Sequence, residues 1–219
     1  MQSLWWQIFD MLGTMAFALS GTLVGVSRRM DLFGVFVLAA ATAIGGGIMR
    51  DILLGHTPPV AMRSSMYFWL IFDTFFVTSF IIRYFNVRHR MFDNFKKAYL
   101  LSDAIGLGSF TVTGTLLGCM AYPESWVLDI ALGVITAVGG GVIRDLLAGT
   151  VPTIFLRDIY AAASLAGASL LYSMLMMFGF SIDVSGIACF VCTVVIRIVA
   201  LSLHWNLPRV RRRRDGDIL

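Results

Sequence analysis

Apolar residues occur along this chain in seven long segments, separated by short polar or turn-forming stretches. The segments occupy residues 4–26, 32–54, 65–86, 97–119, 125–148, 159–180 and 183–205. Each is close to the roughly 20 apolar residues that a helix needs to cross a bilayer. The intervening stretches contain glycine, proline or charged residues, which resist burial in hydrocarbon. The pattern predicts an all-α integral membrane protein with seven transmembrane helices.

Composition supports the bilayer as the solvent of this chain. Hydrophobic residues occupy 58% of the 219 positions and charged residues 14%, whereas soluble domains carry about a quarter charged residues. Seven spans leave no room for a separate soluble domain. The sequence contains no nucleophile–base arrangement, phosphate-binding loop or zinc motif, so we expect neither an enzyme nor a cofactor.

Lysine and arginine are distributed unequally between alternate loops, which predicts the orientation. One set of loops holds 13 of these residues, and the opposite set holds only Arg63. Basic loops face the cytoplasm, so the N-terminus is predicted outside and the C-terminus inside, as an odd number of spans requires. The tail arginines, at positions 209 and 211–214, are expected to touch anionic lipid headgroups rather than nucleic acid.

Two parts of the chain repeat the same residues in the same order. Residues 42–63 and 136–157 are identical at 11 of 22 positions. Upstream, residues 10–25 share seven further identities with residues 103–118. Such self-similarity is the sequence signature of an internal repeat.

The repeat unit is three apolar segments long, so its second copy must enter the membrane in the opposite direction. We therefore predict two inverted three-helix repeats at 1–92 and 93–180, a seventh helix at 181–205 and a basic cytoplasmic tail at 206–219. Inverted repeats are typical of transporters and some channels.

Three consecutive glycines lie inside both the second and the fifth segment. They are Gly45, Gly46, Gly47, Gly139, Gly140 and Gly141. Small residues allow close helix packing, and the spaced pairs at 21/25 and 114/118 are interpreted in that way. Three glycines in a row also weaken a helix, by roughly 1 kcal/mol each relative to alanine. A loosened backbone is tolerated where it lines a cavity or is buried in protein.

We therefore predict that both helices kink or unwind at these triplets and line an ion pathway. The hydroxyls of Thr42 and Thr136 are expected to join the freed carbonyls. A monovalent cation is predicted at the backbone carbonyls of Gly45, Gly46, Gly139 and Gly140.

An arginine–aspartate pair follows each triplet, as Arg50-Asp51 and Arg144-Asp145. Ionisable residues in spans are costly and usually functional, although an arginine near a helix end also extends to the interface. Adjacent helical residues do not face each other, so each arginine is expected to find its partner elsewhere. From their depths we predict two ion pairs at the pore mouths, Asp10–Arg50 outside and Asp103–Arg144 inside. The roles of Asp73, Asp129 and Arg197 stay open between an ion relay and structural contacts.

The doubled GGGxxRD pattern, in two three-span units followed by a seventh span, resembles the prokaryotic branch of the trimeric intracellular cation (TRIC) channel family. The resemblance covers essentially the whole chain. It implies a homotrimer with an hourglass-shaped hydrophilic pathway in each protomer, permeable to K⁺ and also to Na⁺, in a bacterial plasma (inner) membrane. It also gives the two glycine triplets the role of helix kinks.

A secondary transporter of a small solute such as glycine is the alternative. Inverted repeats suit alternating access at least as well as a pore. A channel passes ions passively, whereas a transporter shows saturable, substrate-coupled flux. No ion-coupling signature in the sequence decides between the two.

Overall fold

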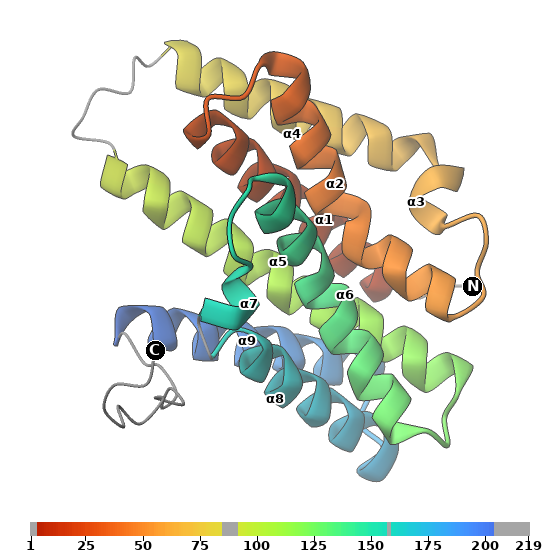
Figure 1. Cartoon of the computed structure of the whole chain (residues 1–219). Helices are drawn as coiled ribbons and strands as arrows, with labels where there is room; N and C mark the ends of the chain where they lie inside the picture. The colour runs from red at the N-terminus through yellow and green to blue at the C-terminus, as the bar shows by residue number, and fades with distance from the viewer. Residues whose placement is uncertain (1–3, 85–91, 157–158, 204–219) are drawn as a thin grey trace, which may run out of the picture.

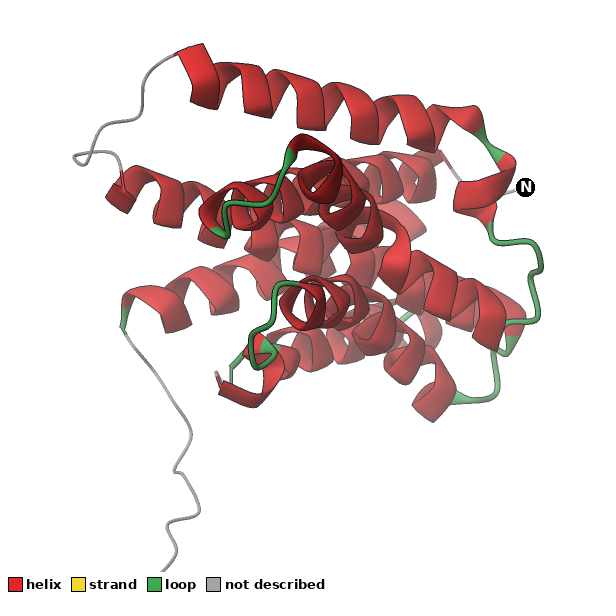
Figure 2. Cartoon of the chain, turned by 45° about the horizontal axis from the view of Figure 1, so that its top comes forward, coloured by secondary structure: helices red, strands yellow, loops and turns green. Residues whose placement is uncertain are grey.

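The computed structural model describes residues 4–84, 92–156 and 159–203, which form helices and connecting loops without a strand (Figure 2). The helices are α1 (Leu4–Ser27), α2 (Leu32–Leu53), α3 (Val60–Arg63), α4 (Ser65–Tyr84), α5 (Phe92–Ala121), α6 (Trp126–Leu147), α7 (Thr153–Leu156), α8 (Ala161–Tyr172), the π-helical turn η2 (Ser173–Met177) and α9 (Ile182–Ser202). The basic tail at 206–219 and the arginines at 88, 90 and 157 lie outside the described residues.

Each of the seven apolar segments contains a helix in its described part, and the prediction of an all-helical membrane protein is confirmed. Six helices are long and apolar enough to cross a membrane: α1, α2, α4, α5, α6 and α9. The remaining segment is a shorter apolar helix over Ala161–Met177, whose last turn is π-helical.

Helix ends repeat between the two halves of the chain. Gly55 and Gly149 follow α2 and α6 with φ of 71° and 67°, a left-handed conformation that glycine adopts without a steric penalty. The next backbone N–H, of His56 or Thr150, donates to the carbonyl of Asp51 or Asp145 at 2.8 and 2.9 Å. This is the Schellman termination, and it stops each helix just after its arginine–aspartate pair.

Helices α1 and α5 form the centre of the molecule, with α2 and α6 packed against them (Figure 1). The spaced glycines make these contacts, as predicted. A Cβ at Gly21 would lie 2.8 Å from Cα of Ala39 in α2, and one at Gly114 would lie 2.8 Å from Cα of Gly133 in α6. Small residues thus bring α1 against α2 and α5 against α6. Helix α4 lies at one edge and α9 packs on α5 and α8.

Candidate functional site

Helices α2 and α6 run in opposite directions (Figure 1), and they cross at the glycine triplets, where Gly139 of α6 lies against Gly46 of α2. A Cβ at Gly46 would collide with the Thr136 carbonyl, and a Cβ at Gly140 would collide with the Thr42 carbonyl. The two backbones therefore meet directly, which only glycine permits at these two positions. Because the helices are antiparallel, their C-terminal arginines lie on opposite sides of the crossing.

The expectation that both helices unwind at the triplets is wrong for this structure. Helices α2 and α6 are uninterrupted through Gly45–Gly47 and Gly139–Gly141. The buried hydroxyls of Thr42 and Thr136 donate to the carbonyls of Leu38 and Leu132 in their own helices, both at 2.6 Å. The backbones of α2 and α6 are in direct contact at the triplets, which leaves no lumen for unpaired carbonyls to face. In this conformation the glycines therefore serve close helix packing.

Two phenylalanines from α1 and α5 close the centre beside this crossing. Phe17 and Phe110 are 0% and 2% exposed, and their rings meet edge to face with centroids 5.2 Å apart. Each ring packs over a glycine of the opposite helix, Phe17 against Gly106 and Phe110 against Gly13. The Phe17 ring also lies against Gly140 of α6.

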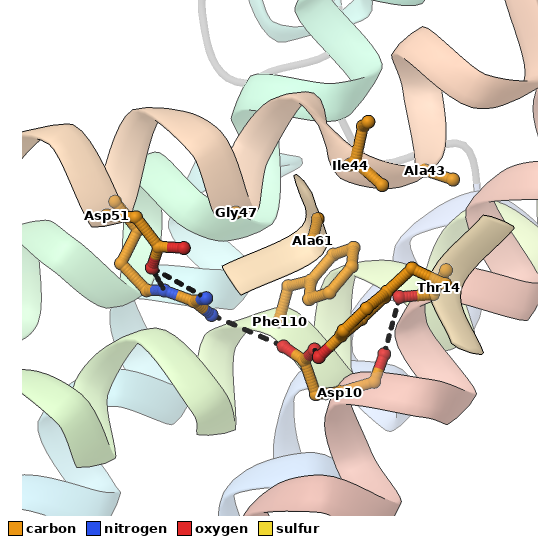
Figure 3. Close-up of a pocket in the computed structure, with 10 residues that line it drawn as sticks. Asp10, Thr14, Ala43, Ile44, Gly47, Asp51, Ala61 and Phe110 are labelled. Atoms are coloured by element: carbon orange, nitrogen blue, oxygen red, sulfur yellow. Dashed lines mark hydrogen bonds and ion pairs between the residues drawn. The ribbon is translucent and has the colours of Figure 1, made fainter. Parts of the chain in front are cut away.

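The first charge cluster lies at the C-terminal end of α2 and contains Trp6, Asp10, Arg50, Asp51 and Tyr67. The Arg50 guanidinium lies 3.3 Å from an Asp10 carboxylate oxygen and 2.9 Å from one of Asp51. The Tyr67 hydroxyl donates to the other Asp10 oxygen at 2.5 Å, and the guanidinium carbon lies 5.2 Å from the Trp6 ring centroid. Figure 3 shows Asp10 and Asp51 converging on one guanidinium group.

The second charge cluster lies at the end of α6 and contains Tyr99, Asp103, Arg144, Asp145 and Tyr160. The Arg144 guanidinium binds Asp103 at 2.6 Å and Asp145 at 2.8 Å. Its central carbon lies 5.0 Å from the Tyr99 ring centroid, and the Tyr160 hydroxyl donates to Asp103 at 3.4 Å. Each member stands 93 or 94 positions after its counterpart in the first cluster.

The predicted pairs Asp10–Arg50 and Asp103–Arg144 are confirmed. The expectation that neither arginine would contact its neighbouring aspartate is wrong. In both clusters the long guanidinium side chain bends back, and its Nε donates to the adjacent carboxylate at 2.9 Å. The second oxygen of that carboxylate accepts a backbone N–H, from Val60 at 2.8 Å or Thr153 at 2.7 Å. These bonds hold α3 and α7 to the ends of α2 and α6.

The two clusters differ in their remaining partners. Ser20 of α1 accepts a hydrogen bond from Arg144 at 2.6 Å. Arg197 of α9 lies 4.0 Å from Asp103 and stacks 4.7 Å from the Tyr160 ring centroid. The first cluster has instead a cavity of about 10 Å³, lined by Asp10, Arg50 and Tyr67 among others (Figure 3). That volume holds about one water molecule.

Two acids of open role lie apart from both clusters. Asp129, in the first turn of α6, is buried against Gly118 of α5. Asp73 is exposed on α4. Sequence reasoning also missed Trp6, Tyr67, Tyr99 and Tyr160, although the common offset of 93 from Tyr67 to Tyr160 was a signal that could have found the two tyrosines.

The fold and its paired clusters define a polytopic helical membrane protein in which the same buried charge network is built twice. A family profile described as "Glycine transporter" matches residues 7–83 and again residues 100–176. The chain therefore belongs to this family, the TRIC-like UPF0126 family, as a prokaryotic member.

Known relatives and solved structures agree with this assignment. A UPF0126 membrane protein of Vibrio cholerae is 36% identical over 204 residues, covering 92% of this chain and 81% of its own. The UPF0126 inner membrane protein YadS of Escherichia coli is 33% identical, covering 94% and 97%.

Two solved structures match at similar coverage. One, described as showing the structural basis for conductance through TRIC cation channels, has a TM-score of 0.78 at 38% identity and covers 94% of this chain and 98% of its own. The other is the TRIC trimeric intracellular cation channel orthologue of Rhodobacter sphaeroides, with a TM-score of 0.79 at 32% identity, covering 91% and 98%.

Proposed function

We propose that this protein is a passive channel for monovalent cations, K⁺ and also Na⁺, with one hourglass-shaped pathway in each protomer of a homotrimer. The observation that carries the proposal is the doubled charge cluster. Buried carboxylates stand on both sides of the α2–α6 crossing, and acidic side chains along a pore attract cations. Solved relatives described as cation channels support the same class.

The pathway is proposed to run along the α2–α6 crossing, past Thr42 and Thr136. In its open form the glycine triplets separate, and the carbonyls of Gly45, Gly46, Gly139 and Gly140 coordinate the permeant ion. The Phe17–Phe110 pair is the constriction that keeps this conformation closed, since apolar constrictions gate by excluding water. Asp10, Arg50 and Asp51 would line one mouth, and Asp103, Arg144 and Asp145 the other.

The proposed membrane arrangement has seven spans, in two inverted three-helix units with α9 as the last span. The bias of lysine and arginine supports an external N-terminus and a cytoplasmic C-terminus in the inner membrane. Anionic lipid headgroups are the proposed partners of the tail at 206–219, with no role in nucleic-acid binding.

The test is purified protein in a planar bilayer under a K⁺ gradient. We expect discrete single-channel currents that reverse near the K⁺ equilibrium potential, and smaller currents in Na⁺. Silent bilayers, combined with saturable solute uptake into liposomes, would reject the channel.

A transporter of a small solute such as glycine is the second candidate, because the matching family profile carries that description. Radiolabelled glycine uptake into the same liposomes separates the two functions. A channel leaves glycine flux at the level of empty liposomes, whereas a transporter raises it until it saturates.

A further inference from the structure

A carboxyl group is buried at the contact between α5 and α6, away from both charge clusters. Asp129, in the first turn of α6, is 0% exposed, and one of its oxygens lies over Gly118 of α5. Neither oxygen accepts a hydrogen bond from an N–H or O–H group of the described residues. Burying an acid in this way is costly, so its presence here requires a specific explanation.

A thiol lies beside this carboxyl. The side chains of Cys119 and Asp129 interact across the contact between α5 and α6. Cys119 is a free cysteine, 5% exposed, in an apolar cluster that includes Leu116 and Leu132. A thiol is a weak hydrogen-bond donor, so it offsets little of the cost of burying the acid. We call these two side chains the acid–thiol pair.

The first unit makes the same helix contact without such a pair. The counterparts of the cysteine and the aspartate, 93 and 94 positions earlier, are Val26 and Val35. A Cβ at Gly25 would lie 3.1 Å from Cα of Val35. In the second unit, a Cβ at Gly118 would lie 2.7 Å from Cα of Asp129. Two valines therefore suffice to pack this crossing, and packing alone does not explain an acid and a thiol.

We propose that the acid–thiol pair binds a thiophilic divalent cation, with Zn²⁺ as the natural ligand and Cd²⁺ as a probe. Thiolate and carboxylate are both zinc ligands, at about 2.3 and 2.1 Å. At a tetrahedral angle, these bond lengths place sulfur and oxygen about 3.6 Å apart. That is an ordinary separation for a thiol in contact with a carboxyl, so the metal can enter without moving α5 from α6.

Charge balance also favours a divalent cation. A buried carboxyl without a cationic partner is neutral, as is a thiol. Zn²⁺ displaces both protons to water and forms one Zn–S and one Zn–O bond. The site is thus neutral before and after the exchange. Water completes the coordination, because α5 ends at Ala121, α6 begins at Trp126, and residues 121–124 between them are exposed.

The first test titrates the purified full-length chain with Zn²⁺ in a calorimeter. We expect one Zn²⁺ per chain and the release of two protons, which buffers of different ionisation enthalpy measure. Asp129→Val gives the second unit the residue of the first. It should weaken binding at least about tenfold, since even the partners of metal ligands contribute that much. Equal affinity in the wild type and Asp129→Val, or no binding to the wild type, overturns the proposal.

The second test locates the sulfur. Cd²⁺ should give a thiolate-to-metal absorption band in the ultraviolet with the wild type, and Cys119→Ser should lose it. Cys192→Ser is the matched control and should retain the band. Cys192 and Cys189 of α9 have the CxxC spacing, so they are the alternative source of a sulfur ligand. A band that is lost with Cys192→Ser and retained with Cys119→Ser refutes the proposed site.

Thermal unfolding without metal checks that the variants fold. Asp129→Val should be at least as stable as the wild type, because it removes a buried carboxyl that lacks an N–H or O–H partner. Added Zn²⁺ should raise the unfolding temperature of the wild type and leave that of Asp129→Val unchanged. An equal rise in both proteins would place the metal elsewhere and reject the site. These measurements need no K⁺ current, so they test the site separately from the proposed channel.

Discussion

Phe17 and Phe110 stand 93 positions apart in the sequence, and their rings touch at the centre of the molecule, 5.2 Å between centroids. The contact joins equivalent positions of the two repeated units. Each ring rests over the glycine that precedes the other ring by four residues, Gly106 or Gly13. Loosening this pair would act on both units at once.

The first prediction concerns this pair. Phe17→Leu and Phe110→Leu should each raise the open probability for K⁺ in planar bilayers, because a smaller side chain weakens the apolar constriction. Both substitutions remove buried volume, so each should also destabilise the protein, by about 1 kcal/mol or more. Phe76→Leu, at a 58% exposed position, is the control and should change neither. Unchanged gating in both central variants would remove the pair as the constriction.

The second prediction concerns the glycine crossing. Gly46→Ala should reduce K⁺ flux and stability, because the added methyl collides with the Thr136 backbone and forces α2 from α6. Gly47→Ala is the matched control, since only the Arg50 guanidinium lies near its Cβ, at 3.7 Å. Gly46→Leu and Gly140→Leu should reduce flux further while the particle stays trimeric. Equal behaviour of Gly46→Ala and Gly47→Ala would show that the crossing does not control permeation.

The third prediction concerns the first charge cluster. Arg50→Gln leaves Asp10 and Asp51 buried without their cation, so unfolding in detergent should become easier by roughly 3 kcal/mol. Asp10→Asn in the same background should restore part of that loss, because one of the two unpaired carboxylates is gone. A double-mutant cycle measures this coupling. Strictly additive effects would contradict a direct pair.

The fourth prediction concerns orientation. A reporter fused after Leu219 should be cytoplasmic, and one inserted between Tyr122 and Glu124 should be external. One set of loops carries 13 lysines and arginines, and basic loops generally face the cytoplasm. Alkaline phosphatase and green fluorescent protein fusions report the two sides. A cytoplasmic loop at 120–125 would reject both the orientation and the inversion of the second unit.

The repeat made the long-range ion pairs predictable. Aligning the two repeats showed that Asp103 corresponds to Asp10 and Arg144 to Arg50. The depth of each residue along its apolar helix then predicted the pairs Asp10–Arg50 and Asp103–Arg144. Hydropathy alone placed the six long apolar helices and the shorter one over Ala161–Met177, but it did not predict the short helices α3 and α7.

The state of the glycine triplets could not be predicted in the same way. Consecutive glycines allow a helix either to unwind or to pack closely against another helix. Which of the two occurs depends on the atoms of the neighbouring helix that lie against the glycines. Here the backbone carbonyl of Thr136 lies against Gly46, and that of Thr42 lies against Gly140. The bond from Arg50 to Asp51 was missed because adjacent Cβ atoms diverge, whereas a guanidinium on three methylenes can bend back to its neighbour.

Arg197 makes the net charges of the two clusters unequal. Helix α9 brings this second cation to one cluster, so two arginines there face two aspartates, whereas Arg50 alone faces Asp10 and Asp51. With all groups ionised, the Arg144 cluster is formally neutral and the Arg50 cluster carries one negative charge. A pathway between unequal mouths concentrates K⁺ more strongly at the negative one, so in equal salt its current should rectify, flowing more readily from the Arg50 side. Arg197→Gln should make the current–voltage curve more symmetric.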